Sequence, residues 1–319
     1  MQKKCLLIAA LFAVCFAVHA TVLSENFSSD PALDGWRISG NTNLAQWDST
    51  NHTLQFTWDS GQTNTYFYHP LGTVLDRDDD FSVAFDLFLK DIGPGPDPDK
   101  SFSFDITIGL LNFSDATRPG FLRGTGYSSP DLCEFDYFFD SGYGATVWPL
   151  IVDTNSTFNY NSSDDYAVSA LDTNTWYHVL MNYTASNHTM VTMVSSATTN
   201  FSITDPVAAS IGDFRLDTIS VSSFNDDQGY GSSVLAHGAV ANIALTLPPP
   251  AVTSFQGGLS DGTWSAQFIS RTNWTYTLQR STDLQTWSDA GTTNGNGGTI
   301  QFEDNANGTT QFYRVEATR

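Results

Sequence analysis

Residues 102–110 read FSFDITIGL, with an apolar side chain at every second position from Phe102 to Leu110. Such alternation places the apolar side chains on one face of a β-strand and the remaining side chains on the other face. We find no convincing helical periodicity after residue 20, so the sequence predicts an all-β protein, either a sandwich or a jelly roll. Similar strand-like runs occur at residues 81–87, 177–183, 219–221 and 243–247.

A proline run at residues 247–251, LPPPA, separates two groups of predicted strands. Three consecutive prolines favour a stiff, extended spacer. We therefore expect one domain over residues 21–248 and a small β-sandwich over residues 249–319. The second domain carries the pattern YTLQRSTDLQTW…FYRV and resembles small C-terminal modules of many secreted bacterial proteins. That resemblance implies no chemistry.

The first 20 residues, MQKKCLLIAALFAVCFAVHA, have the layout of a secretory signal peptide. Lys3 and Lys4 form a charged start, an apolar stretch follows, and residues 18–20 are similar to a cleavage site. The sequence thus predicts a secreted or cell-surface protein, and no later stretch is long enough for a spanning helix in the mature chain. Removal of the signal peptide would leave Cys133 as the only cysteine, so no disulfide could form within one molecule.

The chain is strongly acidic, because 13 Lys and Arg residues face 34 Asp and Glu residues, giving a formal net charge of −21 at pH 7. Such a surface repels the phosphates of nucleic acids and the head groups of anionic lipids. Nucleic acid is therefore not expected among the partners. The acidity also suits a salt-tolerant secreted protein or a calcium binder, and composition does not separate the two.

Three short motifs in the first domain resemble the concanavalin A-like lectin and glucanase superfamily. They are Glu25-Asn-Phe27 with Gly35-Trp36, Trp176-Tyr-His-Val179 followed by Tyr183, and Glu134-Phe-Asp136. The first two are similar to strands of laminin G-like domains. Their order and spacing imply a concanavalin A-like jelly roll of two stacked antiparallel sheets over residues 21–248.

The stretch CEFDYFFDSGYG, residues 133–144, contains the carboxylates of most interest. Family 16 glycoside hydrolases of this superfamily carry ExDxE or ExDxxE, and the resemblance places Glu134 at the nucleophile position and Asp136 at the assisting position. Phe138 and Phe139 occupy the acid/base position in the two spacings, and phenylalanine cannot transfer a proton. The sequence therefore argues against catalysis of the family 16 type. A glycoside hydrolase or polysaccharide lyase of the same fold stays an alternative.

The same stretch is also similar to the metal-binding strand EFDTF…N of legume-type lectins, in which Glu and Asp bind manganese and calcium. Glu134, Asp136 and Asp140 fall at the three corresponding offsets, and carboxylate oxygens suit calcium. Ala145 and Leu150 replace the later Asp and His of the family, so the resemblance does not extend to the transition metal. Calcium would need backbone carbonyls or water to complete six or more ligands.

A simpler interpretation needs no metal. Strand alternation would turn Glu134 and Asp136 toward solvent on the concave sheet, while Phe135, Tyr137 and Phe139 fill the core. This arrangement is compatible with sugar binding, because carboxylates beside exposed aromatic rings can hold hydroxyl-rich rings.

Aromatic residues provide the second half of the predicted binding site. Tyr143 and Trp148 are our preferred candidates, because the glycine-flanked turn that holds them follows the strand with Glu134 and Asp136. We therefore predict a secreted, lectin-like protein without catalytic activity, which binds a polysaccharide or glycan and has calcium as its candidate cofactor. A structural cell-surface or matrix protein is the third class that the sequence allows.

Overall fold

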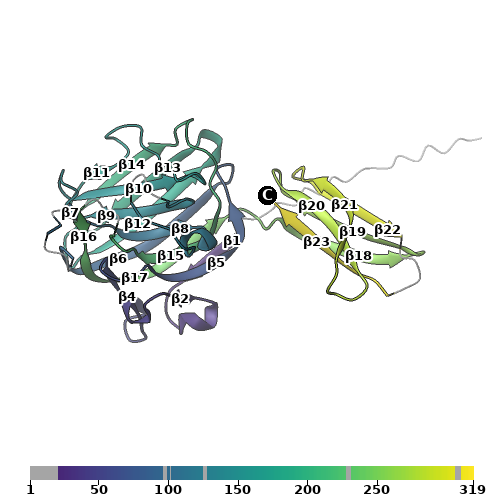
Figure 1. The fold of residues 1–319 in the computed structure, drawn as a ribbon, viewed down its shortest axis with the longest axis horizontal. Coiled ribbons are helices and arrows are strands. Elements are labelled where there is room, and N and C mark those ends of the chain that lie inside the picture. Colours follow the sequence, from purple (N-terminus) through teal and green to yellow (C-terminus); the bar gives the residue numbers. More distant parts are fainter. Residues whose placement is uncertain (1–20, 96–98, 101, 125–127, 228–230, 306–309) are drawn as a thin grey trace, which may run out of the picture.

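The computed structural model describes residues 21–95, 99–100, 102–124, 128–227, 231–305 and 310–319 (Figure 1). The signal peptide predicted for residues 1–20 lies outside these described residues. Strands dominate the described chain, and none of its helices is long and apolar enough to cross a membrane. The helical segments are η1 (Pro31–Asp34), η2 (Thr42–Leu44), α1 (Phe113–Ala116) and η3 (Ala185–Asn187).

Two large antiparallel sheets are formed by the strands that precede residue 248 (Figure 1). The eight-stranded sheet has the order β14-β13-β12-β6-β17-β4-β3, and β1 pairs with β17. Its strands are β1 (Thr21–Glu25), β3 (Ala45–Asp48), β4 (Thr53–Asp59), β6 (Phe81–Gly93), β12 (Trp176–Thr184), β13 (Thr189–Ser195), β14 (Asn200–Pro206) and β17 (Leu235–Leu247).

The seven-stranded sheet has the order β11-β10-β9-β8-β15-β5-β2. Its strands are β2 (Arg37–Ser39), β5 (Thr65–Leu75), β8 (Ile106–Leu111), β9 (Leu132–Phe138), β10 (Thr146–Val152), β11 (Ala167–Val168) and β15 (Leu216–Ser223). A short parallel pair, β7 (Phe102–Ser103) and β16 (Ser232–Ser233), lies outside both sheets.

The core lies between the two sheets. Phe135 of β9 packs edge-on against Phe85 of β6, with ring centroids 5.6 Å apart. Alternation then turns Cys133 and Tyr137 toward the same core, and both are buried. Two antiparallel sheets stacked over one core make a jelly-roll sandwich, so the predicted all-β class is confirmed.

The strands after residue 250 form a smaller pair of sheets around their own core (Figure 1). Three-stranded sheets have the orders β18-β19-β22 and β21-β20-β23. The strands are β18 (Val252–Ser260), β19 (Thr263–Ser270), β20 (Thr275–Ser281), β21 (Ser288–Asn294), β22 (Thr299–Asn305) and β23 (Phe312–Thr318). The buried residues of this core are Phe268, Trp274, Tyr276, Leu278, Ile300 and Phe302.

Ion pairs connect the two pairs of sheets. Arg271 pairs with Asp79, which follows β5, and Arg319 pairs with Asp79 and Asp76. Arg319 also donates a hydrogen bond of 3.1 Å to the backbone oxygen of Val74. The side chains of Arg319 and Asp79 are nearly buried, so solvent screens these ion pairs less than it screens exposed ones.

Gly109 of β8 shows how closely the chain packs around β9. A Cβ atom at this position would lie 2.5 Å from the backbone oxygen of Cys133 and 2.6 Å from Cα of Glu134. Such distances are shorter than van der Waals contact, and both opposing atoms belong to the backbone of β9. Only glycine therefore allows β8 and β9 to keep their present separation.

We expect Gly109→Ala to lower the free energy of unfolding by about 2 kcal/mol, because the added methyl group forces the two strands apart. Gly93→Ala in β6 is the matched control, since no atom lies within 4 Å of the Cβ position there. Denaturant unfolding of both variants measures the difference. Equal stability of the two variants would contradict this account of Gly109.

Candidate functional site

A row of directly opposed residues crosses the seven-stranded sheet. Trp148 of β10 lies opposite Asp136 of β9, which lies opposite Thr107 of β8. The row continues through Ser222 of β15 to Tyr66 of β5. Because Phe135 points into the core, alternation directs this row to the face that is turned away from the eight-stranded sheet. We call this face the far face.

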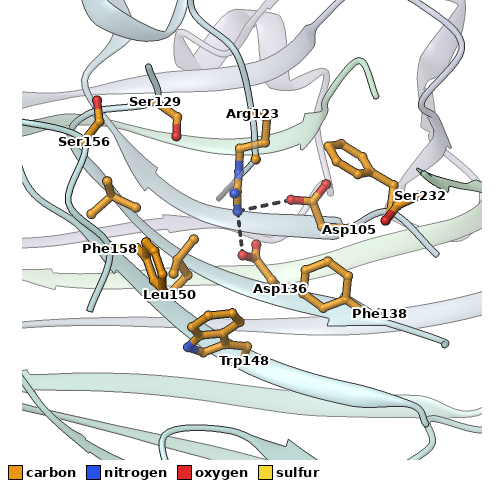
Figure 2. Close-up of a pocket in the computed structure, with 13 residues that line it drawn as sticks. Asp105, Arg123, Ser129, Asp136, Phe138, Trp148, Leu150, Ser156, Phe158 and Ser232 are labelled. Atoms are coloured by element: carbon orange, nitrogen blue, oxygen red, sulfur yellow. Dashed lines mark hydrogen bonds and ion pairs between the residues drawn. The ribbon is translucent and has the colours of Figure 1, made fainter. Parts of the chain in front are cut away.

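A buried arginine lies beside Asp136 on the far face (Figure 2). Arg123, which lies between α1 and β9, places its Nη2 atom 2.6 Å from Oδ2 of Asp136 and 3.1 Å from Oδ2 of Asp105. Nη2 is also 3.2 Å from Oε2 of Glu134. Asp105 directly precedes β8, so the cluster joins three separate segments. Thr107 supports it by donating a hydrogen bond of 3.1 Å to Oδ1 of Asp136.

Burial shifts the ionisation of this cluster. It raises the pKa of Asp105 to about 7, although the neighbouring Arg123 opposes the shift. Burial also raises the pKa of Asp136 and raises that of Glu134 well above its ordinary value. For Arg123 burial lowers the pKa, but its three carboxylate partners outweigh this effect and keep the guanidinium charged. One cation thus faces three carboxyl groups, and the cluster retains a proton near neutral pH.

Several polar atoms of the cluster are buried without a hydrogen-bond partner. They are both carboxylate oxygens of Glu134, Oδ1 of Asp105 and Nε of Arg123. The contact between Glu134 and Arg123 is therefore an ion pair that lacks hydrogen-bond geometry. Buried polar groups in folded proteins almost always have partners, so such exceptions point to a water molecule or a ligand that completes them.

A cavity of about 110 Å³ lies beside the cluster (Figure 2). Its polar lining comes from Asp105, Arg123, Asp136, Ser129, Ser156 and Ser232. The opposite wall is apolar, and Figure 2 shows Trp148, Leu150 and Phe158 below the guanidinium. The cavity therefore offers charged and hydroxyl groups on one side and flat apolar surface on the other, which is the usual character of a small-molecule site.

A larger groove of about 620 Å³ adjoins this cavity. The two share Phe138, Trp148 and Ser232 as lining residues. Tyr143 and Tyr160, which also line the groove, expose 83% and 52% of their surface. None of the described residues that line the groove is charged; the others are Phe102, Ser103, Ser141, Thr146 and Tyr166.

Trp148 is one of two aromatic residues that line both the cavity and the groove, the other being Phe138. The Trp148 ring packs edge-on against Phe158 and Tyr160, with centroids 6.0 Å and 6.1 Å apart. Tyr166 lies on a further side at 6.3 Å. These contacts fix the orientation of the indole while leaving part of it open, so the groove has a preformed aromatic wall.

The structure brings together some of the residues that the sequence predicted. Asp136 lines the cavity, Tyr143 lines the groove and Trp148 lines both. The expectation that Glu134 and Asp136 face solvent is wrong, because both are 0% exposed. Glu134 does not line the cavity and contacts Arg123 instead.

Sequence reasoning missed Asp105 and Arg123. Asp105 occupies one of the polar positions of the alternating run at residues 102–110. A charged residue at such a position is what an ordinary solvent-facing side of a strand would show. Arg123 lies in an irregular segment where no periodic pattern marks it. The one available signal was scarcity, because basic residues are few in so acidic a chain.

Of the three carboxylates predicted to bind calcium, Glu134 and Asp136 meet at Arg123, and Asp140 does not contact that residue. Asp140 lies in the turn after β9, where its carboxylate accepts a hydrogen bond of 3.0 Å from the backbone nitrogen of Gly142. Glu134 and Asp136 instead contact Arg123, whose guanidinium supplies the local positive charge. No group of three or more His, Cys, Asp or Glu side chains that could hold a metal ion occurs among the described residues. The predicted calcium set therefore does not fit this geometry.

No protein-family model matches the chain, and no curated protein matches it significantly. Among solved structures it is similar to peanut lectin, at 16% identity and a TM-score of 0.43, over 72% of this chain and 99% of that chain. Lectin II from Ulex europaeus is similar at 17% identity and a TM-score of 0.44, over 71% of this chain and 98% of that chain. The Lotus tetragonolobus seed lectin is similar at 9% identity and a TM-score of 0.44, over 72% of this chain and 100% of that chain. Likenesses of this extent assign no function.

We expect the free energy of unfolding to fall as the pH rises from about 4 to about 7. Asp105 has its pKa raised from 3.8 to about 7, so the folded protein binds more protons than the unfolded chain in this window. Burial also raises the pKa values of Asp131 and Asp205 to about 7, which adds to the same slope. Denaturant unfolding at about pH 5 and about pH 8 measures the slope.

The variant Asp105→Asn isolates the contribution of this residue. Asparagine cannot ionise, so the substitution should destabilise the protein less at about pH 8 than at about pH 5, by up to roughly 3 kcal/mol. A destabilisation of equal size at both pH values would show that Asp105 is not the titrating group.

We expect calcium to leave the melting temperature unchanged. About 5 mM calcium would stabilise a millimolar site by about 1 kcal/mol and a tighter site by more. Thermal unfolding with calcium, with magnesium and with a chelator makes the comparison. A rise of several degrees with calcium alone, lost in Asp140→Asn, would restore the calcium site that the sequence predicted.

Proposed function

We propose that this is a secreted or cell-surface carbohydrate-binding protein whose ligand lies in the aromatic groove and extends into the cavity beside Arg123. The single observation that carries the proposal is the junction at Trp148, where an aromatic wall meets a floor of buried charged groups. A sugar ring has apolar faces that stack on aromatic rings and a hydroxyl edge that needs donors and acceptors. The two halves of the site supply both requirements.

Exposure of the groove supports the same conclusion. Tyr143 and Tyr160 are large rings that remain largely open to solvent beside the half-buried Trp148. Clustered exposed aromatic surface on a monomer usually marks a binding site rather than a structural requirement. A purely structural matrix protein does not require exposed aromatic rings around a cavity, so this feature favours binding over a structural role.

Hydrolysis by Glu134 receives no support from the geometry. The side chain is 0% exposed, contacts Arg123 and is not among the residues that line the cavity. A nucleophile must reach the sugar carbon that it attacks, so this carboxylate has no access to a bound glycan. Secretion rests on the pattern of residues 1–20, and calcium is not part of the proposed function.

A glycan array of neutral and acidic oligosaccharides tests the proposal. We expect binding that falls at least about tenfold in Trp148→Ala, equivalent to about 1.4 kcal/mol, because the shared aromatic wall is lost. Tyr143→Ala should weaken binding less, because its ring lies at the outer edge of the groove and makes fewer contacts.

Trp176→Ala is the matched control. Trp176 is an exposed tryptophan on β12 of the eight-stranded sheet, and it does not line the groove. Its removal should leave the affinity unchanged. Absence of binding to every glycan, or equal losses in Trp148→Ala and Trp176→Ala, would reject the proposed site.

A further inference from the structure

Arg123 lines two cavities and is the only described lining residue that they share. Besides the cavity described above, it lines a second one of about 280 Å³, whose wall includes Asn64, Leu122 and Asn225. The groove, the first cavity, Arg123 and the second cavity therefore follow one another. A glycan chain that entered from the groove and continued across the far face would have to pass through the space that the arginine side chain fills.

Several contacts hold the Arg123 side chain in place. Three carboxylates contact Nη2 of Arg123, and the guanidinium carbon lies 5.3 Å from the centre of the Phe224 ring. Phe121, two residues earlier, packs on the same ring, with centroids 5.9 Å apart. The preceding segment is tied down by Tyr66, whose hydroxyl donates a hydrogen bond of 2.7 Å to the backbone oxygen of Ala116. Displacing Arg123 would leave buried carboxylates without their cation, which is costly.

The size of the first cavity fits the edge of one sugar ring. Its volume of about 110 Å³ is several times larger than the roughly 10–15 Å³ that one water molecule needs. It is smaller than the cavity of about 150 Å³ that can hold benzene. A ring edge or a hydroxymethyl group therefore fits, while the rest of the ring and the following residues stay in the groove.

The polar residues that line the cavity define the chemistry of that edge. Asp105 and Asp136 offer acceptors, Arg123 offers donors, and the hydroxyl groups of Ser129 and Ser156 can do either. A hydroxyl group can serve both roles, whereas a carboxylate or sulfate can only accept. An anionic group would also lie beside Asp105 and Asp136 in a chain of net charge −21. The cavity thus favours uncharged, hydroxyl-bearing sugars.

From these observations we infer that the site binds the chain end of an uncharged glycan, with the terminal residue in the cavity and the next residues along the aromatic groove, and that Arg123 prevents binding within a chain. The inference rests on the proposed carbohydrate-binding function and adds the class of ligand to it. Arg123 is a positioning residue in this account, because it closes the site and orients the three carboxylates.

Stoichiometry distinguishes chain-end binding from binding within a chain. The probes are neutral gluco-, galacto- and manno-oligosaccharides of increasing length, and titration calorimetry gives the number of protein molecules bound per chain. We expect one protein per chain at every length, and an affinity that stops rising after a few residues. A number of bound proteins that grows with chain length would overturn the inference and leave the proposed function intact.

Blocked ends provide the second arm. Oligosaccharides with a bulky substituent on the non-reducing residue, or on the reducing residue, are compared with the free oligosaccharides of the same length. One of the two substituents should lower the affinity at least about tenfold, because it cannot enter the cavity, and it identifies the end that is recognised. Equal affinity for free chains and for both blocked forms would overturn the inference.

Oligouronates of matched length test the charge preference at low and high salt. We expect no binding in either condition, and affinity equal to that of the neutral chains would overturn the uncharged class. Failure of every probe to bind would reject the proposed function, and this inference with it. Because all these measurements use the unmodified protein, they stay decisive even if Arg123→Met does not fold. Where Arg123→Met folds, more than one molecule of the variant protein should bind to each long glycan chain.

Discussion

The far face of the seven-stranded sheet depends on one buried ion-pair cluster. The Nη2 atom of Arg123 lies within 3.2 Å of oxygens from Asp105, Glu134 and Asp136. Removing one partner from such a cluster leaves buried charge uncompensated, at a cost of about 3–5 kcal/mol. The cluster joins the segment after α1 to β9 and to the residue before β8, and without the arginine neighbouring carboxylates would repel one another beside the cavity.

Strand geometry decides which side chains can join that cluster. Alternation lets β9 serve two environments at once, with Phe135 in the core and Asp136 on the far face. Gly109 allows β8 to approach β9 without a clash against its backbone. Trp148 lies directly opposite Asp136 in the register of β9 and β10, so the apolar wall of the site stands beside its polar floor. Register alone thus produces a surface suited to an amphipathic ring.

The fold was predictable because its signal is local. Alternating runs such as residues 102–110 encode which face of a strand is buried, and neighbouring residues carry that information. The site was predictable only where it lies on such a strand or in the turn after it, as for Asp136, Tyr143 and Trp148. The burial of Glu134 and Asp136 was not predictable, because it depends on Arg123 from a separate, irregular segment, and alternation distinguishes two faces without telling which one another segment covers.

The calcium prediction stays a prediction, and the geometry around its three carboxylates differs from the pattern that it assumed. Side chains six residues apart on a continuing strand share a face but lie roughly 20 Å apart. Asp140 could therefore approach Glu134 only through the chain that follows β9, which ends at Phe138. The chain then turns, and the Asp140 carboxylate accepts a hydrogen bond within that turn. The carboxylates left on β9 still need a positive charge, and a guanidinium meets this need without a metal because it is permanently charged. The guanidinium also belongs to a long side chain, which fills space that a bare metal ion would leave open. In this structure that side chain lies between the two cavities that Arg123 lines.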